Sequence, residues 1–288
     1  MSTVPVEEIA PKPRWFKSTD GAFYAGLIIL GGSYLVFIIA MLAADAYFIA
    51  NSPPDVKQDV MNVLLSEDIQ YSIRFTLISC CITTVLALWV SVPIAYLMSR
   101  HRFFGKSLID AILDIPIVLP PLVIGLSLLI LFRYTPYVKM LDNAFPIALH
   151  IPAVIIAQFS VACAFAVRTL RSTFDEIPLR REQVALTLGC SRSQAFWNVV
   201  MPEARRGLLT AATLAWARSL GEFGPILIFA GTTPQRTEVL SVSVHLQIAA
   251  GKLDAAVAIS LMMVVIALTV LILFRVVVGG NLTPKLSR

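Results

Sequence analysis

The sequence predicts an all-α protein that crosses a membrane six times. Charged residues make up only 14% of the chain and apolar residues 57%, whereas a soluble domain carries about 25% charged residues. The apolar residues are gathered in runs that reach or exceed the roughly 18 residues needed for a membrane-spanning helix. The net charge of +5 is small and lies mainly between these runs. It therefore indicates orientation in a membrane rather than a nucleic-acid-binding patch.

The six predicted spans divide the chain into a first helix and a larger core. They cover residues 22–47, 72–99, 112–132, 149–170, 207–230 and 254–277. The first span could be a cleaved signal, because Ala44-Asp45-Ala46 resembles a cleavage site. Its apolar run is longer than the 7–15 residues of a usual signal core, which favours a retained helix. Residues 1–21 and 278–288 then form the two tails, and residues 70–277 form a core with five spans.

The basic residues predict which side of the membrane each loop faces. Sixteen of the 23 Lys and Arg residues lie in the two tails, the second loop and the polar segment around residues 168–206. The opposite loops hold five, and Arg74 and Arg218 lie in or at the spans. Because basic loops stay in the cytoplasm, both termini and the long loop 171–206 are expected to be cytoplasmic.

Prolines interrupt the third span. Pro116, Pro120 and Pro121 fall within six residues and remove amide donors that a regular helix needs. Irregular backbone at membrane depth is tolerated where it is buried in protein or lines a watery cavity. Pro120 and Pro121 are therefore candidates for a transport path, and tight packing without a path is the alternative.

The long cytoplasmic loop predicts two short helices. The first covers about residues 179–188 and ends at Gly189, which can adopt the left-handed conformation. Ser191 and Gln194 have capping-box spacing and begin the second helix, which Pro202 is expected to end. A rigid helix pair of this kind could dock a soluble partner, or it could lie in the membrane interface as an amphipathic element.

The fifth span contains two opposite charges. Arg218 and Glu222 are four residues apart, so a helix places them on one face where they can pair. Charges within a membrane usually face the bundle interior or a wet cavity. The pair is either a gate in a pathway or a structural lock between helices. Gly221 and Gly224 would permit a bend or a close helix approach.

The spacing within the long loop resembles a known family. The loop carries Gln183, Val184, Ala185, Gly189, Val199, Met201 and Pro202 at intervals of three, nine and one intervening residues. This resembles the EAA loop, Glu-Ala-Ala-x3-Gly-x9-Ile-x-Leu-Pro, of ABC importer permeases. Gln183 replaces the Glu of that pattern, and the neighbouring Glu182 can supply the missing charge. Trp197 is either a docking anchor or a residue that packs on the membrane helices.

Three further segments extend the resemblance over about residues 70–277. Residues 93–100 and 119–125 are similar to core helices of the family. Residues 217–224, Ala-Arg-Ser-Leu-Gly-Glu-Phe-Gly, look like the molybdate/tungstate and sulfate branch. The resemblance implies a type I ABC importer permease fold in a bacterial-type inner membrane.

The resemblance also implies partners and a cargo. A second permease subunit, taken to be a copy of this chain, would complete the pathway in the lipid bilayer. Two cytoplasmic ATPase subunits would bind the loop, and an extracytoplasmic binding protein would deliver molybdate, or else tungstate or sulfate. ATP and Mg would sit on the ATPase, because Gly105-Lys106-Ser107 has Arg100 where a P-loop needs its first glycine.

Three other functions remain open in the sequence, one of which is a passive membrane anchor or scaffold. The chain could be a permease for another small solute, such as a polyamine or phosphate. It could also be an intramembrane enzyme, although it has no His-Glu-x-x-His or Gly-x-Ser-x-Gly motif to supply catalytic residues. His101, His150 and His245 are scattered, so neither a metal site nor a cofactor on this chain is expected.

Overall fold

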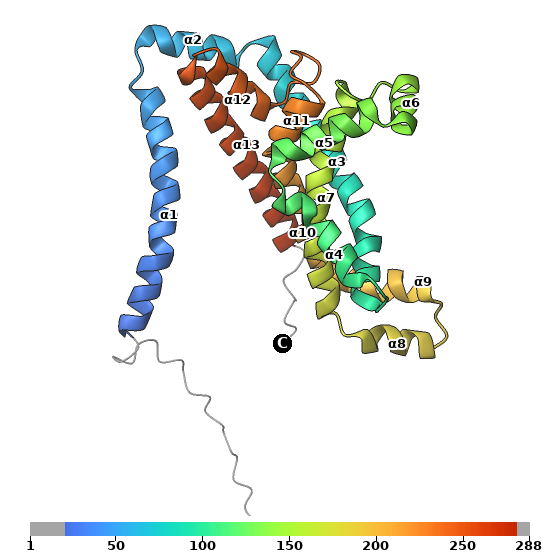
Figure 1. Cartoon of the computed structure of the whole chain (residues 1–288). Helices are drawn as coiled ribbons and strands as arrows, with labels where there is room; N and C mark the ends of the chain where they lie inside the picture. Colours follow the sequence, from blue (N-terminus) through green and yellow to red (C-terminus); the bar gives the residue numbers. More distant parts are fainter. Residues whose placement is uncertain (1–20, 281–288) are drawn as a thin grey trace, which may run out of the picture. The chain divides into compact units, whose positions relative to one another are not determined.

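The computed structural model describes residues 21–280, and every regular element in that range is a helix (Figure 1). The chain forms two units, Met1–Asn51 and Ser52–Arg288. The predicted tails lie largely outside the described residues, which leave out 1–20 and 281–288. Nothing structural is therefore added to the expectation that both tails are cytoplasmic.

The first unit is a single apolar helix, α1 (Gly21–Ala50). Its 30 residues correspond to about 45 Å at 1.5 Å per residue, enough to cross a hydrocarbon core of about 30 Å. Apolar side chains cover all its faces, as in helices that contact lipid or other helices on every side. The predicted span 22–47 is confirmed as a helix.

The second unit is built around three packed helices, α3 (Glu67–Arg100), α7 (Ile151–Glu176) and α10 (Met201–Leu220). Small side chains allow these helices to approach closely, as is usual within membranes. Four alanines form one buried cluster between them: Ala87, Ala162, Ala166 and Ala215. Small residues thus let the three helices approach, while larger side chains such as Phe174 and Trp216 fill the adjoining buried clusters.

Shorter helices and one long helix complete the unit. Helix α13 (Leu253–Gly280) packs against α12 (Leu240–Ala249), α10 and α2 (Pro54–Leu64). Figure 1 shows α13 running alongside α12 from the end of the bundle where α2 lies.

Length and composition identify four spanning helices among the described residues: α1, α3, α7 and α13. The pair α4 (Lys106–Val118) and α5 (Pro121–Tyr134) is also apolar enough together but is bent by 111°, as in a broken span or a re-entrant loop, so the described residues hold four or five spans where six were predicted. The proline-rich segment therefore breaks its helix, as predicted. The expected span 207–230 is divided between α10 and the six-residue α11 (Gly224–Phe229), so no single helix covers it.

The long loop differs from its prediction at both ends. Helix α7 continues to Glu176, so residues 171–176 belong to it. The expectation that Pro202 ends a helix is wrong, because Pro202 lies in the first turn of α10. A π-helical segment, η1 (Phe196–Val200), precedes it, and Met201 N–H bonds to the Phe196 carbonyl. This wider turn accommodates the proline, which has no N–H to donate.

Helix α6 (Pro136–Ala144) follows α5 outside the membrane-spanning segments. The buried Asp142 carboxylate accepts hydrogen bonds of 2.8 Å from the backbone N–H groups of Ile147 and Ala148. Arg133 Nε lies 3.9 Å from Asp142 Oδ2. Burial alone would raise the pKa of Asp142, but the two backbone donors and Arg133 outweigh it and lower the pKa below its ordinary value. The carboxylate thus fixes the chain that leaves α6.

Candidate functional site

The long loop is an ordered helix pair. Helix α8 (Leu179–Thr187) is followed by Gly189, whose φ of +91° lies in the left-handed region. Ser191 and Gln194 form the reciprocal capping box that begins α9 (Arg192–Ala195). Both local predictions are confirmed. The loop has a defined shape because its turns and caps are specified by residues within it.

Helix α8 has an inward and an outward face. Glu182 and Ala185 are buried, whereas Gln183 and Val184 are exposed. Gln183, which occupies the position of the family's Glu, therefore faces away from the core. The buried carboxylate in this helix is that of Glu182, the residue before Gln183.

Glu182 contacts the end of α3. Its Oε2 lies 3.4 Å from Arg100 Nε, and both side chains are largely buried. The Tyr96 hydroxyl donates a hydrogen bond to Glu182 Oε1. Glu182 was a predicted site residue, whereas its contacts with Tyr96 and Arg100 were not predicted.

Exposed apolar side chains lie on the outer side of the loop. Trp197 is 60% exposed, Val184 50% and Leu188 80%. Trp197 meets Phe196 edge-on, with 5.2 Å between ring centroids, and its side chain remains open to the surroundings. A separate cavity of about 520 Å³ lies between the end of α3 and the loop and is lined by Tyr96 and Phe196, among others. An exposed aromatic residue with apolar neighbours is typical of an interface.

The two interrupted spans pack against each other. A Cβ atom on Gly125 of α5 would lie 2.7 Å from the Pro225 Cα of α11. A Cβ atom on Gly224 would lie 2.9 Å from the Pro121 Cβ. Only glycine allows the backbones to approach this closely. The break at Pro120–Pro121 and the break after Leu220 therefore meet in space, although the sequence separates them by about a hundred residues.

Arg218 and Glu222 lie at this junction and form an ion pair. The Nη1–Oε2 distance is 2.9 Å, and the Glu222 side chain is 1% exposed. The Arg218 guanidinium also lies 5.7 Å from the centre of the Phe165 ring. The predicted pairing is confirmed. Its two readings, a gate and a structural lock, both remain predictions.

A buried amide near this pair was missed by the sequence analysis. The Gln158 side chain of α7 donates to Ser79 Oγ and to the Ser219 carbonyl, each at 3.3 Å. It accepts a bond of 3.0 Å from Thr83. Gln158 thus connects α3, α7 and the end of α10. The available signal was the one side-chain amide in the predicted span 149–170, which is largely apolar.

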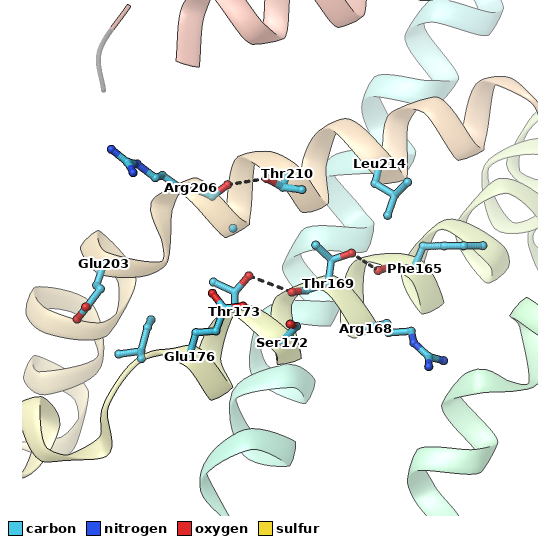
Figure 2. Close-up of a pocket in the computed structure, with 12 residues that line it drawn as sticks. Phe165, Arg168, Thr169, Ser172, Thr173, Glu176, Glu203, Arg206, Thr210 and Leu214 are labelled. Carbon is cyan, nitrogen blue, oxygen red and sulfur yellow. Dashed lines mark hydrogen bonds between the residues drawn. The ribbon is translucent and has the colours of Figure 1, made fainter. Parts of the chain in front are cut away.

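A second cavity, of about 720 Å³, lies between α7 and α10 next to the loop (Figure 2). Its threonines bond within their own helices: Thr169 donates to Phe165, and Thr173 to Thr169. A Cβ atom on Gly207 would lie 2.6 Å from the Thr173 Cβ, so the helices touch at this point. The cavity is lined by both polar and apolar side chains, and α7 and α10 cross closely at Gly207.

Two ion pairs join α4 to α7, and the sequence analysis did not identify either. Arg168 Nη1 lies 2.9 Å from Asp114 Oδ2, and Arg171 pairs with Asp110. Figure 2 shows that the Arg168 side chain points away from α10, and its partner Asp114 belongs to α4. None of the α4 residues is buried, so these ion pairs are partly exposed to solvent. Across the described residues 21–280, no group of three or more His, Cys, Asp or Glu side chains could hold a metal ion.

The fold is that of a transporter membrane subunit. The chain superimposes with a TM-score of 0.70 on a chain of a bacterial alginate ABC transporter, solved in complex with an alginate pentasaccharide-bound periplasmic protein. The match covers 89% of this chain and 93% of the other at 17% sequence identity, which supports the fold alone. The chain therefore has the fold of that transporter chain.

The family follows from the sequence match. Residues 91–288 match the family of binding-protein-dependent transport system inner membrane components, and the chain belongs to this family. It is 31% identical over 260 residues to the sulfate transport system permease protein CysT of Escherichia coli K12, covering 90% of this chain and 88% of that one.

Permeases named for molybdate, tungstate or molybdenum have a sequence identity to this chain close to that of the sulfate permease. The molybdate/tungstate permease protein WtpB of Pyrococcus furiosus is 30% identical over 243 residues, covering 84% of this chain and 92% of that one. The molybdenum permease protein ModB of Azotobacter vinelandii is 35% identical over 187 residues, covering 62% and 81%. The resemblance to the sulfate and molybdate/tungstate permeases is therefore confirmed.

Proposed function

We propose that this chain is the membrane subunit of an ATP-driven importer for a tetrahedral oxyanion, with molybdate first, then tungstate or sulfate. The observation that carries the proposal is similarity along most of the chain to permeases named for these three anions. The anions share a tetrahedral shape and a double negative charge. The same pathway architecture therefore suits all three, and the choice among them rests on finer contacts.

The loop is the proposed contact with a separate ATPase. Capping at Ser191 and the turn at Gly189 make it rigid, and a rigid element can pass on a displacement. Trp197 and Val184 present apolar surface outward, where a partner could cover it. ATP and Mg belong to that partner in this proposal. In this proposal the loop and both termini face the cytoplasm, which the positive-inside rule supports.

The junction of the two broken spans is the proposed pathway. Broken helices at membrane depth are where transporters commonly place their pathways. Pro121 packs against Gly224, two residues from Glu222, so a shift of α5 would reach the ion pair. A second copy of this chain would complete the path, and an extracytoplasmic binding protein would deliver the anion to it.

Uptake into proteoliposomes tests the proposal. The vesicles would contain the permease with its ATPase, with ATP inside and the anion-loaded binding protein outside. We expect molybdate to accumulate only when ATP and the binding protein are both present, and tungstate or sulfate to compete. Accumulation of phosphate or a polyamine, with none of the three anions, would contradict the oxyanion assignment.

A variant of the loop tests the docking role separately. Trp197→Ser should reduce the amount of ATPase that co-purifies with the permease, because an exposed aromatic anchor is lost. Phe104→Ser is the matched control, since Phe104 is a fully exposed aromatic residue outside the loop. Equal co-purification in the two variants would contradict a docking role for Trp197.

A further inference from the structure

The end of α3 touches the loop although it is distant in sequence. Tyr96 and Arg100 are four residues apart and share one face of the last helical turns. Both reach Glu182 of α8: Tyr96 by a hydrogen bond, Arg100 by an ion pair of 3.4 Å. We call these three residues the α3–α8 strap.

Burial makes the strap more than a surface contact. The Arg100 and Glu182 side chains are 7% and 11% exposed, so each charge depends on the other for compensation. The Tyr96 ring is fixed by edge-on contacts with Phe174 of α7, at 5.8 Å, and with Phe196 of η1, at 4.7 Å. The hydroxyl therefore has a defined direction, and the loop cannot move away from α3 without breaking a buried polar contact.

The ion pair has room to tighten. Charge-assisted hydrogen bonds between such groups are typically about 2.7–2.9 Å long. The Arg100–Glu182 separation of 3.4 Å is longer. A push on α8 towards α3 can shorten this distance, and a pull can open it, so the contact responds to displacement in both directions.

The other end of α3 leads to the ion pair at the broken spans. Ser79 and Thr83 of α3 bond to Gln158, which in turn bonds to the Ser219 carbonyl next to Arg218. From Tyr96 to Ser79 is 17 residues of continuous helix, about 25 Å. Named contacts thus run from Glu182 along α3, which stays helical through Pro93 although that proline donates no backbone hydrogen bond, to the residue beside the Arg218–Glu222 pair.

We propose that Tyr96 and Arg100 are positioning residues that transmit movement of the loop to α3, and through α3 to the junction of the broken spans. The loop is joined by sequence only to α7 and α10, so the strap adds a third membrane helix to the path of force. This inference rests on the proposed function, in which a partner ATPase moves the loop.

The test measures anion moved per ATP hydrolysed in the reconstituted complex with its binding protein. Tyr96→Phe removes only the hydroxyl and leaves the Arg100–Glu182 ion pair in place. We expect about a tenfold fall in anion moved per ATP, with ATPase binding and basal hydrolysis within about twofold of the unaltered complex. Arg102→Gln is the matched control for charge removal, since Arg102 is exposed and lies just beyond α3; its ratio should stay unchanged.

A further variant covers the case of impaired assembly. Arg100→Gln alone leaves Glu182 buried without its cation and should lower the yield of complex. Arg100→Gln with Glu182→Gln should restore the yield while the transport ratio stays low. A normal ratio in this double variant or in Tyr96→Phe would overturn the strap.

The outcomes also separate the strap from the proposed function. Transport and hydrolysis falling in equal proportion would show that the strap only supports docking, and would overturn the transmission role alone. An unaltered complex that hydrolyses ATP with no response to any anion would overturn the proposed function, and the strap with it.

Discussion

Replacement of Arg218 by Gln tests whether the Arg218–Glu222 ion pair stabilises the junction of the broken spans. Glu222 is 1% exposed, and its charged partner is Arg218 at 2.9 Å. Loss of the guanidinium leaves a buried carboxylate without its cation, which costs about 3–5 kcal/mol in comparable cases. That is a large part of the roughly 5–15 kcal/mol that keeps a typical domain folded. We therefore expect Arg218→Gln to lower Tm markedly, and Arg218→Gln with Glu222→Gln to restore it.

Two assays on the same variants separate a gate from a lock. Thermal unfolding in detergent reports stability, and uptake into proteoliposomes reports transport. A pathway role predicts that the double variant regains Tm but not anion uptake. Arg74→Gln, which removes an exposed arginine of α3, is the control and should leave both unchanged. Recovery of both Tm and uptake would refute the pathway role, and an unchanged Tm in Arg218→Gln would refute the burial argument.

Three further predictions concern packing and charge. Gly207→Ala should force α7 and α10 apart by about 1 Å and lower stability by about 1–3 kcal/mol; Thr173→Gly added to it should restore Tm, and no recovery would contradict the contact. A double-mutant cycle on Asp110 and Arg171 should give about 0.2–1 kcal/mol of coupling that disappears in high salt; salt-independent coupling would argue against a solvated pair. Asp142 has a lowered pKa, so its stabilisation holds above its unfolded pKa and is lost as pH falls through the folded value. Asp142→Asn should flatten the Tm profile in that acid range, and an unchanged profile would count against this account.

Local features of the chain could be predicted because their causes are local. The turn at Gly189 and the capping box at Ser191 depend on residues within three positions of each other. The helical spans follow from a bilayer that leaves no other way to satisfy backbone polar groups. The prediction that Pro202 ends a helix was wrong because it considered the proline alone. Its effect depends on the π turn before it, which the proline alone does not specify.

Contacts between segments far apart in the chain could not be predicted from the sequence. Glu182 was singled out by its position next to a motif, but its partners Tyr96 and Arg100 lie more than 80 residues earlier. Asp110 and Arg171 are separated by 61 residues, and neither belongs to a motif. Long-range pairing of this kind requires the helix packing, because apolar periodicity gives the face of a helix but not its neighbour.

ATPase activity of the reconstituted complex, with its binding protein, tests the central claim most directly. Molybdate, tungstate and sulfate would each be compared with a control without anion. The account predicts that at least one of them stimulates hydrolysis at low concentration, which would also identify the cargo. A complex with normal basal activity that responds to none of the three would contradict the oxyanion assignment.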